Sequence, residues 1–252
     1  MIAIAQKAST RELLLSCLIA KAMWNLDTNR HVAHWTSDAA SRWGVSGGSK
    51  SPFWLGETDP NSSANPLRLN LESTDGRGLP PVAESFVRGS QWHLSMPEDV
   101  GWAESAGVDP FSLSMVIRVV ESSAQRWVAE LTLAIQTSRL DTHPNLDLHC
   151  PGQTDRAESS IDGEPAVVTK TVRSPDSGQI AVLLDHHDAP FTSHCSGDHE
   201  CRLRFFGEFL EKGVIRKARP WLVFSTSANP LTPSDLDELL RRQAATPLPL
   251  TA

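Results

Sequence analysis

Residues 111–120 read FSLSMVIRVV, and residues 126–135, after a short polar turn, read RWVAELTLAI. In both segments every second side chain is apolar, which is typical of strands that bury one face. Both apolar sets must face one core, so odd-numbered residues must lie opposite odd-numbered residues. This register predicts Ile117 opposite Leu131, and it places Arg118 opposite Glu130 on the other face as a pair of opposite charges. The two segments are therefore predicted to form an antiparallel hairpin.

Shorter apolar patterns on both sides of this hairpin predict further strands. They cover residues 67–72, 84–88, 91–96, 146–150 and 166–172, and a continuous apolar run at 180–184 suits a strand that is covered on both faces. A second hairpin is predicted over residues 202–224, with a bulge at Phe206-Gly207 and its turn at Lys212-Gly213, whereas residues 151–164 read as a polar loop. Many short strands joined by turns predict a mainly β fold, either an antiparallel β-sandwich or a supersandwich of the mutarotase-like kind.

The strand patterns divide the chain into three parts. Residues 66–226 are predicted to form the antiparallel β domain, and residues 227–252 a C-terminal helix with a Pro-rich tail. Thr232 and Pro233 provide an N-cap and a first helical position for this helix. Residues 1–65 are predicted to hold a short N-terminal helix and an irregular arm. This arm is expected to lie partly across the β domain, because it carries Trp24, Trp35, Trp43 and Trp54.

The N-terminus allows two interpretations. Leu13 to Ala20 is an apolar stretch followed by Ala20-Lys21-Ala22, which resembles a secretory signal with its cleavage site. Glu12 adjoins the stretch, however, and its shortness favours a short amphipathic helix, or a true start at Met23. A cytoplasmic protein is therefore expected, with export as the alternative. No segment is long enough to predict a membrane span.

Composition and missing motifs exclude several functional classes. The 252 residues are 40% hydrophobic, which suffices for a large core, and the formal net charge is −7. Nucleic acid is not expected as a partner, because phosphate backbones attract clustered Lys and Arg. Walker and GxGxxG patterns are absent from the sequence, which argues against common NTPases and Rossmann dehydrogenases.

Possible zinc ligands are densest in one short region. Imidazole and thiolate groups are the ligands that zinc prefers, and four of them within reach would form a structural site. Their spacing matches no standard zinc motif, and a polar loop without metal, with reduced thiols, is the favoured alternative. Asp188 and Asp198 lie in the same region, and the predicted zinc ligands are His186, His187, His194, Cys195, His199 and Cys201.

A second group of polar residues could bind or transform a sugar. Arg88, Trp92 and His93 belong to one predicted strand pair, and Trp beside Arg could hold a sugar ring. Asp141 and His143 follow in one turn and could act as general acid and base. The alternative, which we favour, is that Asp141 caps its own turn and His143 lies at the surface.

The basic string FLEKGVIRKAR at residues 209–219 is a third candidate site. Glu211 and Lys212 fall at the predicted turn, and Arg216 falls on the strand that follows. Charges at such positions are typical of a sheet edge that is protected from aggregation. A pocket for an anionic ligand is the alternative.

The same string carries a resemblance to a protein family. RFFGEFLEKGVIRKARPWLVF (204–224), with SFVRGSQWH (85–93) and LDTHP (140–144), resembles a set of uncharacterised bacterial proteins, chiefly from planctomycetes. In these proteins an LEKGVIR-type hairpin closes a β-rich domain, and the similarity covers roughly residues 67–225. The resemblance brings no known activity. It implies that recurrent motif positions are occupied by Arg88, Glu208, Glu211, Lys212 and Arg216.

Together these features favour a non-catalytic β-sandwich module that binds a carbohydrate or a small anionic ligand, or another protein. A carbohydrate-active enzyme of mutarotase-like architecture is the alternative. Its candidate acid–base residues are His93, Asp141, His143 and Glu208. A metal-stabilised structural protein is a third hypothesis. The sequence does not indicate an oligomeric state.

Overall fold

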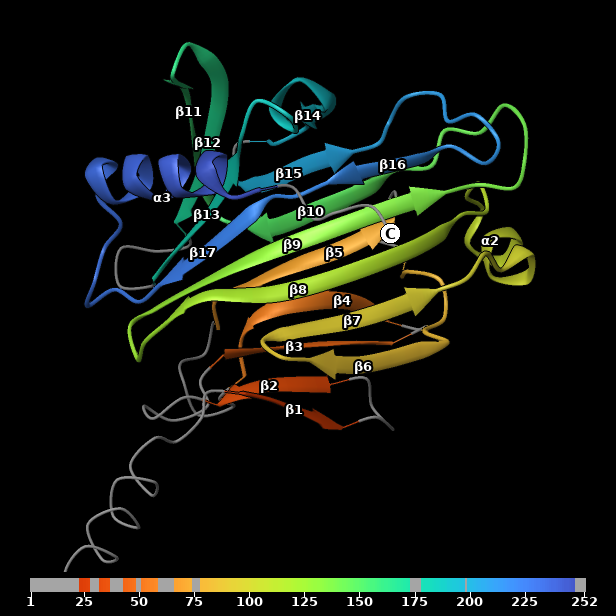
Figure 1. The fold of residues 1–252 in the computed structure, drawn as a ribbon, viewed down its shortest axis with the longest axis horizontal. Coiled ribbons are helices and arrows are strands. Elements are labelled where there is room, and N and C mark those ends of the chain that lie inside the picture. The colour runs from red at the N-terminus through yellow and green to blue at the C-terminus, as the bar shows by residue number, and fades with distance from the viewer. Residues whose placement is uncertain are drawn as a thin grey trace, which may run out of the picture.

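The computed structural model consists of two antiparallel sheets that face each other, which confirms the predicted mainly β sandwich (Figure 1). It describes residues 23–27, 32–36, 43–48, 51–58, 66–73, 78–172, 178–197 and 199–247. The predicted N-terminal helix falls on residues 1–22, which lie outside the described residues. No helix within the described ranges has the length and hydropathy needed to cross a membrane.

The first sheet has eight strands. In their order across the sheet they are β1 (Met23–Asp27), β2 (Val32–Thr36), β3 (Trp43–Gly48), β4 (Ser51–Glu57), β5 (Arg68–Ser73), β10 (Leu146–Pro151), β15 (Glu200–Phe205) and β14 (Thr192–His194).

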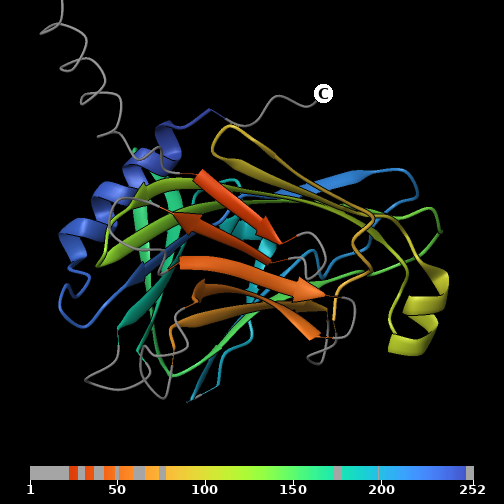
Figure 2. The same cartoon turned by 90° about the horizontal axis from the view of Figure 1, so that it is seen from below.

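The second sheet has nine strands. In order they are β11 (Gln153–Ile161), β12 (Glu164–Val172), β13 (Gln179–Leu184), β17 (Trp221–Ser225), β9 (Arg126–Gln136), β8 (Ser112–Ser122), β7 (Gln91–Met96) and β6 (Glu84–Arg88), with β16 (Ile215–Ala218) also pairing with β9. The helices α2 (Val100–Ala106) and α3 (Pro233–Ala245) lie at opposite ends of the sandwich (Figure 1, Figure 2).

The hairpin predicted at residues 111–135 is confirmed as β8 and β9, in the predicted register. Ile117 pairs with Leu131, and both side chains are fully buried. Arg118 pairs with Glu130 and donates two hydrogen bonds to its carboxylate, from Nε at 3.1 Å and from Nη2 at 2.8 Å. Side-chain alternation thus determined both the buried face and the partner residues.

The prediction of an irregular arm before residue 66 is wrong, because residues 23–57 contain β1 to β4 of the first sheet. Trp24, Trp35 and Trp43 point into the core, and the Trp43 ring stacks on Trp127 of β9 with ring centroids 6.1 Å apart. These strands are five to seven residues long. Each shows too few apolar alternations for a periodicity to stand out, and the Trp rings contribute the buried area instead.

The predicted hairpin at 202–224 is also wrong. β15 belongs to the first sheet and β17 to the second, so residues 206–214 cross from one sheet to the other. The LEKGVIR string therefore forms part of a crossover, in which Gly213 takes the positive φ of 79° that a turn here requires. Alternation shows which side of a strand is buried but not which strand lies next to it.

Residues 151–164, predicted as a loop, contain the strand β11 and the turn that joins it to β12. Their two-residue turn, Asp162-Gly163, has positive φ at both positions, 53° and 88°. Asp-Gly between two strands is a strong hairpin signal, because both residues tolerate this conformation. The signal is in the sequence, but the polar side chains of β11 conceal the strand, which is largely exposed.

The continuous apolar run at 180–184 is confirmed as a strand covered on both faces. β13 turns Ile180 and Val182 toward the core between the sheets. Its other face, with Ala181 and Leu183, packs under the apolar side of α3. Leu236, Leu239 and Leu240 form that side of the helix.

The N-terminus of α3 provides a first testable prediction. Thr232 Oγ1 accepts a hydrogen bond from the Asp235 N–H at 3.2 Å, and the Asp235 carboxylate accepts one from the Thr232 N–H at 3.0 Å. Replacing Thr232 by Ala should lower the free energy of unfolding by about 1 kcal/mol, because one helix N–H loses its acceptor. Urea denaturation can measure this change. Ser234→Ala in the same helical turn should change stability little, and equal losses in both variants would contradict the capping role.

Candidate functional site

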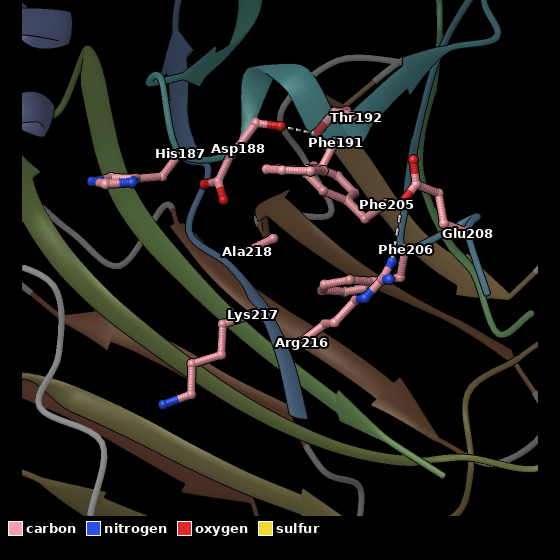
Figure 3. Close-up of a pocket in the computed structure, with 10 residues that line it drawn as sticks. All are labelled: His187, Asp188, Phe191, Thr192, Phe205, Phe206, Glu208, Arg216, Lys217 and Ala218. Carbon is pink, nitrogen blue, oxygen red and sulfur yellow. Dashed lines mark hydrogen bonds and ion pairs between the residues drawn. The ribbon is translucent and has the colours of Figure 1, made fainter. Parts of the chain in front are cut away.

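A pocket of about 300 Å³ opens where the chain crosses between the two sheets. Its walls come from the end of β15, from β16 and from η2 (Ala189–Phe191), the 3-10 helix before β14 (Figure 3). Segments far apart in the sequence therefore meet here. The lining residues are His187, Asp188, Phe191, Thr192, Phe205, Phe206, Glu208, Arg216, Lys217 and Ala218.

Aromatic rings form the apolar part of the pocket. Phe205 and Phe206 are buried, with ring centroids 6.3 Å apart, whereas Phe191 is exposed. Consecutive residues of a strand normally point to opposite faces. Phe206 has a φ of 63°, which is rare for a bulky side chain and ends the strand, and both rings line the pocket. Backbone strain of this kind concentrates at functional sites.

Asp188 supplies a buried carboxylate. Its side chain is 5% exposed, and its carboxylate points into the pocket (Figure 3). Oδ2 accepts a hydrogen bond from the Arg219 N–H at 2.6 Å, but no group among the described residues donates to Oδ1. Burial raises the pKa of Asp188 to about 6, and the nearby Asp185 carboxylate also raises it. A group with such a pKa can hold or release a proton near neutral pH.

Arg216 and Glu208 supply the charges of the outer wall. Arg216 Nη1 lies 3.4 Å from Glu208 Oε2, and 67% of the Glu208 side chain is exposed. Lys217 is adjacent on the strand but its ammonium points away from the pocket, as does the His187 ring (Figure 3). The cation that faces the pocket is therefore Arg216.

The predicted zinc ligands are spread over different environments. Cys201 is buried opposite Cys150, and a hydrogen bond with that thiol lowers the pKa of Cys201, while Cys195 is exposed. The His186 and His187 ring centroids are 3.9 Å apart, and His194 contacts Ser196. Among the described residues, which include His199 but not Asp198, no three His, Cys, Asp or Glu side chains group as metal ligands. Zinc stays a prediction, which metal analysis of untagged protein can test.

Of the residues predicted to bind or transform a sugar, all but Glu208 lie outside the pocket. Trp92 is fully buried, and its Nε1 donates to Ser85 Oγ at 2.8 Å, so its ring is part of the core. His93 stacks on Phe86 with centroids 4.8 Å apart. Burial and the positive charge of the exposed Arg88 lower the pKa of His93.

Asp141 and His143 lie at the surface, in the loop that follows β9. Asp141 is exposed and has a φ of 56°, a left-handed conformation that Asp tolerates in turns. The His143 N–H donates to Asp109, and its ring contacts Phe209 at 5.9 Å. Neither residue lines the pocket.

The third candidate group contributes most to the pocket. Arg216 of this string lines it, as does the predicted acid–base residue Glu208 just before the string, whereas Glu211 and Lys212 are exposed in the crossover. The sequence predicts Asp188 only as a neighbour of zinc ligands, and it gives Phe205 and Phe206 no binding role. Two consecutive Phe residues at a break in alternation were the available signal for the aromatic wall.

Comparison with known proteins adds no family to this description. No protein-family model matches the chain, and a search of curated proteins found no match. The functional assignment therefore depends on the pocket.

The raised pKa of Asp188 predicts a pH-dependent effect on stability. Asp188 binds a proton more tightly in the folded state than in the unfolded state. The free energy of unfolding therefore falls as pH rises from about 4 to 6, and above pH 6 the loss of stability due to Asp188 stays at its full value. Asp188→Asn should therefore increase the free energy of unfolding by about 2 kcal/mol at pH 7.5 and by much less at pH 4.5. Urea denaturation at both pH values measures this difference. An equal effect at the two pH values would contradict it.

Proposed function

We propose that this β-sandwich is a binding module that holds a small ligand with an anionic group in the pocket beside β15 and β16. The observation that carries the proposal is the Arg216 guanidinium on the wall of an aromatic pocket, with a long and exposed ion pair to Glu208. A guanidinium binds carboxylate or phosphate oxygens in a planar, two-pronged geometry. A ligand anion can therefore take the place of Glu208.

The non-ionic part of the ligand is inferred from the size and the lining of the pocket. A pocket of about 300 Å³ suits a small molecule. The rings of Phe205 and Phe206 favour an apolar chain or the C–H face of a ring. A sugar that carries an acidic group satisfies both the aromatic wall and Arg216, so an acidic carbohydrate belongs to the proposed class.

Calorimetric titration with matched ligands tests this function. Glucuronate and benzoate should bind more tightly than glucose and benzyl alcohol, which lack the anion. Arg216→Met should weaken binding of the acids by at least about tenfold, the usual effect of losing a charge-assisted contact. Glu208→Gln should strengthen it several-fold, because the competing carboxylate is neutralised.

Two controls accompany this titration. Lys212→Met, which removes an exposed cation of the crossover that does not line the pocket, should leave affinity unchanged. An Arg216→Met protein that binds the acids as well as the unaltered protein would contradict the proposal. Equal binding of glucose and glucuronate would contradict it as well.

A second candidate function is favoured by Asp188. A buried acid with a pKa of about 6 that shares a pocket with Glu208 is an arrangement found in enzymes that transfer protons to and from sugars. The reaction expected of a mutarotase-like enzyme is interconversion of sugar anomers, which polarimetry follows directly. Acceleration of glucose or glucuronate mutarotation that Asp188→Asn abolishes would support an enzyme. If the protein binds the sugar but does not accelerate its mutarotation, the result would favour the binding module over the enzyme.

A further inference from the structure

We infer that the ligand of this pocket carries a protonated amine as well as an acid, and that the amine binds Oδ1 of Asp188. This inference rests on the proposed function, since it extends the ligand from the Arg216 wall to the Asp188 wall. The pocket would then take amino acids in the broad sense, compounds with an amine at one end and an anionic group at the other.

The first observation is the unsatisfied oxygen of Asp188. Oδ2 is bound to the Arg219 N–H, whereas Oδ1 has no donor among the described residues, and the carboxylate points into the pocket (Figure 3). The Thr192 hydroxyl, a donor in the pocket lining, is already bound to the Asp188 carbonyl at 2.8 Å. A carboxylate that is 5% exposed gains most from a donor brought by a ligand, because water reaches it poorly.

The second observation is an excess of negative charge around this oxygen. The buried Arg219 guanidinium is bound to Asp185 at 3.2 Å, and it also donates to main-chain carbonyls of the C-terminal segment. Arg219 is therefore shared by two carboxylates, Asp185 and Asp188, and His186 contributes only a smaller favourable interaction with the Asp188 carboxylate. The His187 ring points away from the pocket, and His186 is not among the lining residues (Figure 3). A ligand ammonium would balance this charge, which a neutral hydroxyl would not.

The third observation is the surrounding aromatic wall. Phe191 and Phe205 line the pocket together with Asp188. Aromatic faces attract cations, and the attraction is stronger where water is excluded. Rings beside a carboxylate thus favour an ammonium group over a second anion at this wall.

The two charged walls come from different elements. Asp188 precedes η2, whereas Arg216 belongs to β16, and Phe191, Phe205, Phe206 and Ala218 line the same pocket (Figure 3). The pocket therefore has a carboxylate at one wall and the Arg216–Glu208 ion pair at another, and apolar residues also line it. A ligand with both charges joined by an apolar spacer matches this arrangement.

The experiment compares three series of probes by calorimetric titration at pH 7.5. The first comprises ω-aminocarboxylates from β-alanine to 6-aminohexanoate, the second carboxylates of the same chain lengths, and the third the corresponding alkylamines. We expect at least one aminocarboxylate to bind at least about tenfold more tightly than the carboxylate of equal length. Asp188→Asn should remove this gain while the carboxylates still bind.

The outcomes separate this inference from the proposed function. If carboxylates bind through Arg216 and the amine adds no affinity, the inference fails and the proposed function stands. If the gain from the amine survives in Asp188→Asn, the inference also fails, because another group binds the amine. If no probe binds, both fail. The comparison among probes uses the unaltered protein, so it remains valid even if the variant does not fold.

Discussion

Replacement of Arg219 by Met is expected to lower the free energy of unfolding by about 3–5 kcal/mol, the usual cost of breaking a buried ion pair from one side. Arg219 is buried, and its Nη2 lies 3.2 Å from Asp185 Oδ2. The guanidinium also joins the end of α3 to β17 and β13, because it donates to the carbonyl oxygens of Gln243, Thr246 and Pro247. Met fills similar space but leaves the Asp185 charge and these carbonyls without their donor.

Urea denaturation followed by Trp fluorescence measures this loss, and hydrogen exchange should show the end of α3 opening first. Lys212→Met, which also replaces a cationic side chain by Met but at an exposed position, should alter stability by less than about 0.5 kcal/mol. Adding Asp185→Asn to Arg219→Met should recover part of the loss, because the charge that lost its partner is then neutral. If Arg219→Met lowers the free energy of unfolding by less than about 1 kcal/mol, the buried Arg219–Asp185 pair does not stabilise the packing of α3.

Replacement of Asp147 by Asn should cost about 2–4 kcal/mol at pH 7, since it removes the buried anion between two arginines. Asp147 is fully buried. Its Oδ1 accepts a hydrogen bond from Arg204 at 2.8 Å, and its Oδ2 accepts from Arg204 at 2.9 Å and from Arg202 at 3.0 Å. The pKa of Asp147 is lowered: burial opposes this shift, but the hydrogen bonds and charges of Arg204 and Arg202 outweigh it.

The lowered pKa determines how the contribution of Asp147 to stability depends on pH. A carboxyl with a lowered pKa in the folded state contributes stability above its unfolded pKa and loses it as pH falls through the folded value. The difference between Asp147→Asn and the unaltered protein should therefore be full at pH 7 and shrink below pH 4. Glu158→Gln, in the exposed ion pair with Arg156, is the matched control and should change stability little at either pH. A difference that does not shrink in acid would contradict the ionic role of Asp147.

Prediction from sequence succeeded where a local pattern contains the answer. The β8–β9 register followed from alternation alone, and the start of α3 followed from Thr232 and Pro233. It failed at β11, whose exposed polar side chains hide a strand, and at residues 202–224, where two predicted partners joined different sheets. In those places the pattern is the same for several arrangements of neighbouring strands.

The candidate site was predictable only in pieces. Glu208 and Arg216 stood out as charged residues of one string, and Asp188 as a neighbour of predicted zinc ligands. The sequence offered no reason to place them in one site, because β14, β15 and the crossover lie between η2 and β16 in the chain. Trp92 illustrates the opposite error, since a residue predicted to bind a ligand is fully buried in the core.

The sequence by itself determined which side of the main strands is buried, how β8 pairs with β9 and where α3 begins, since side-chain period and capping act between near neighbours. Only the tertiary structure decided that β15 and β17 lie in different sheets, and that Asp188, Phe205 and Arg216 share one pocket. The physical reason is that strand partners and burial depend on how the two faces pack together. That choice belongs to the whole chain and not to any one segment.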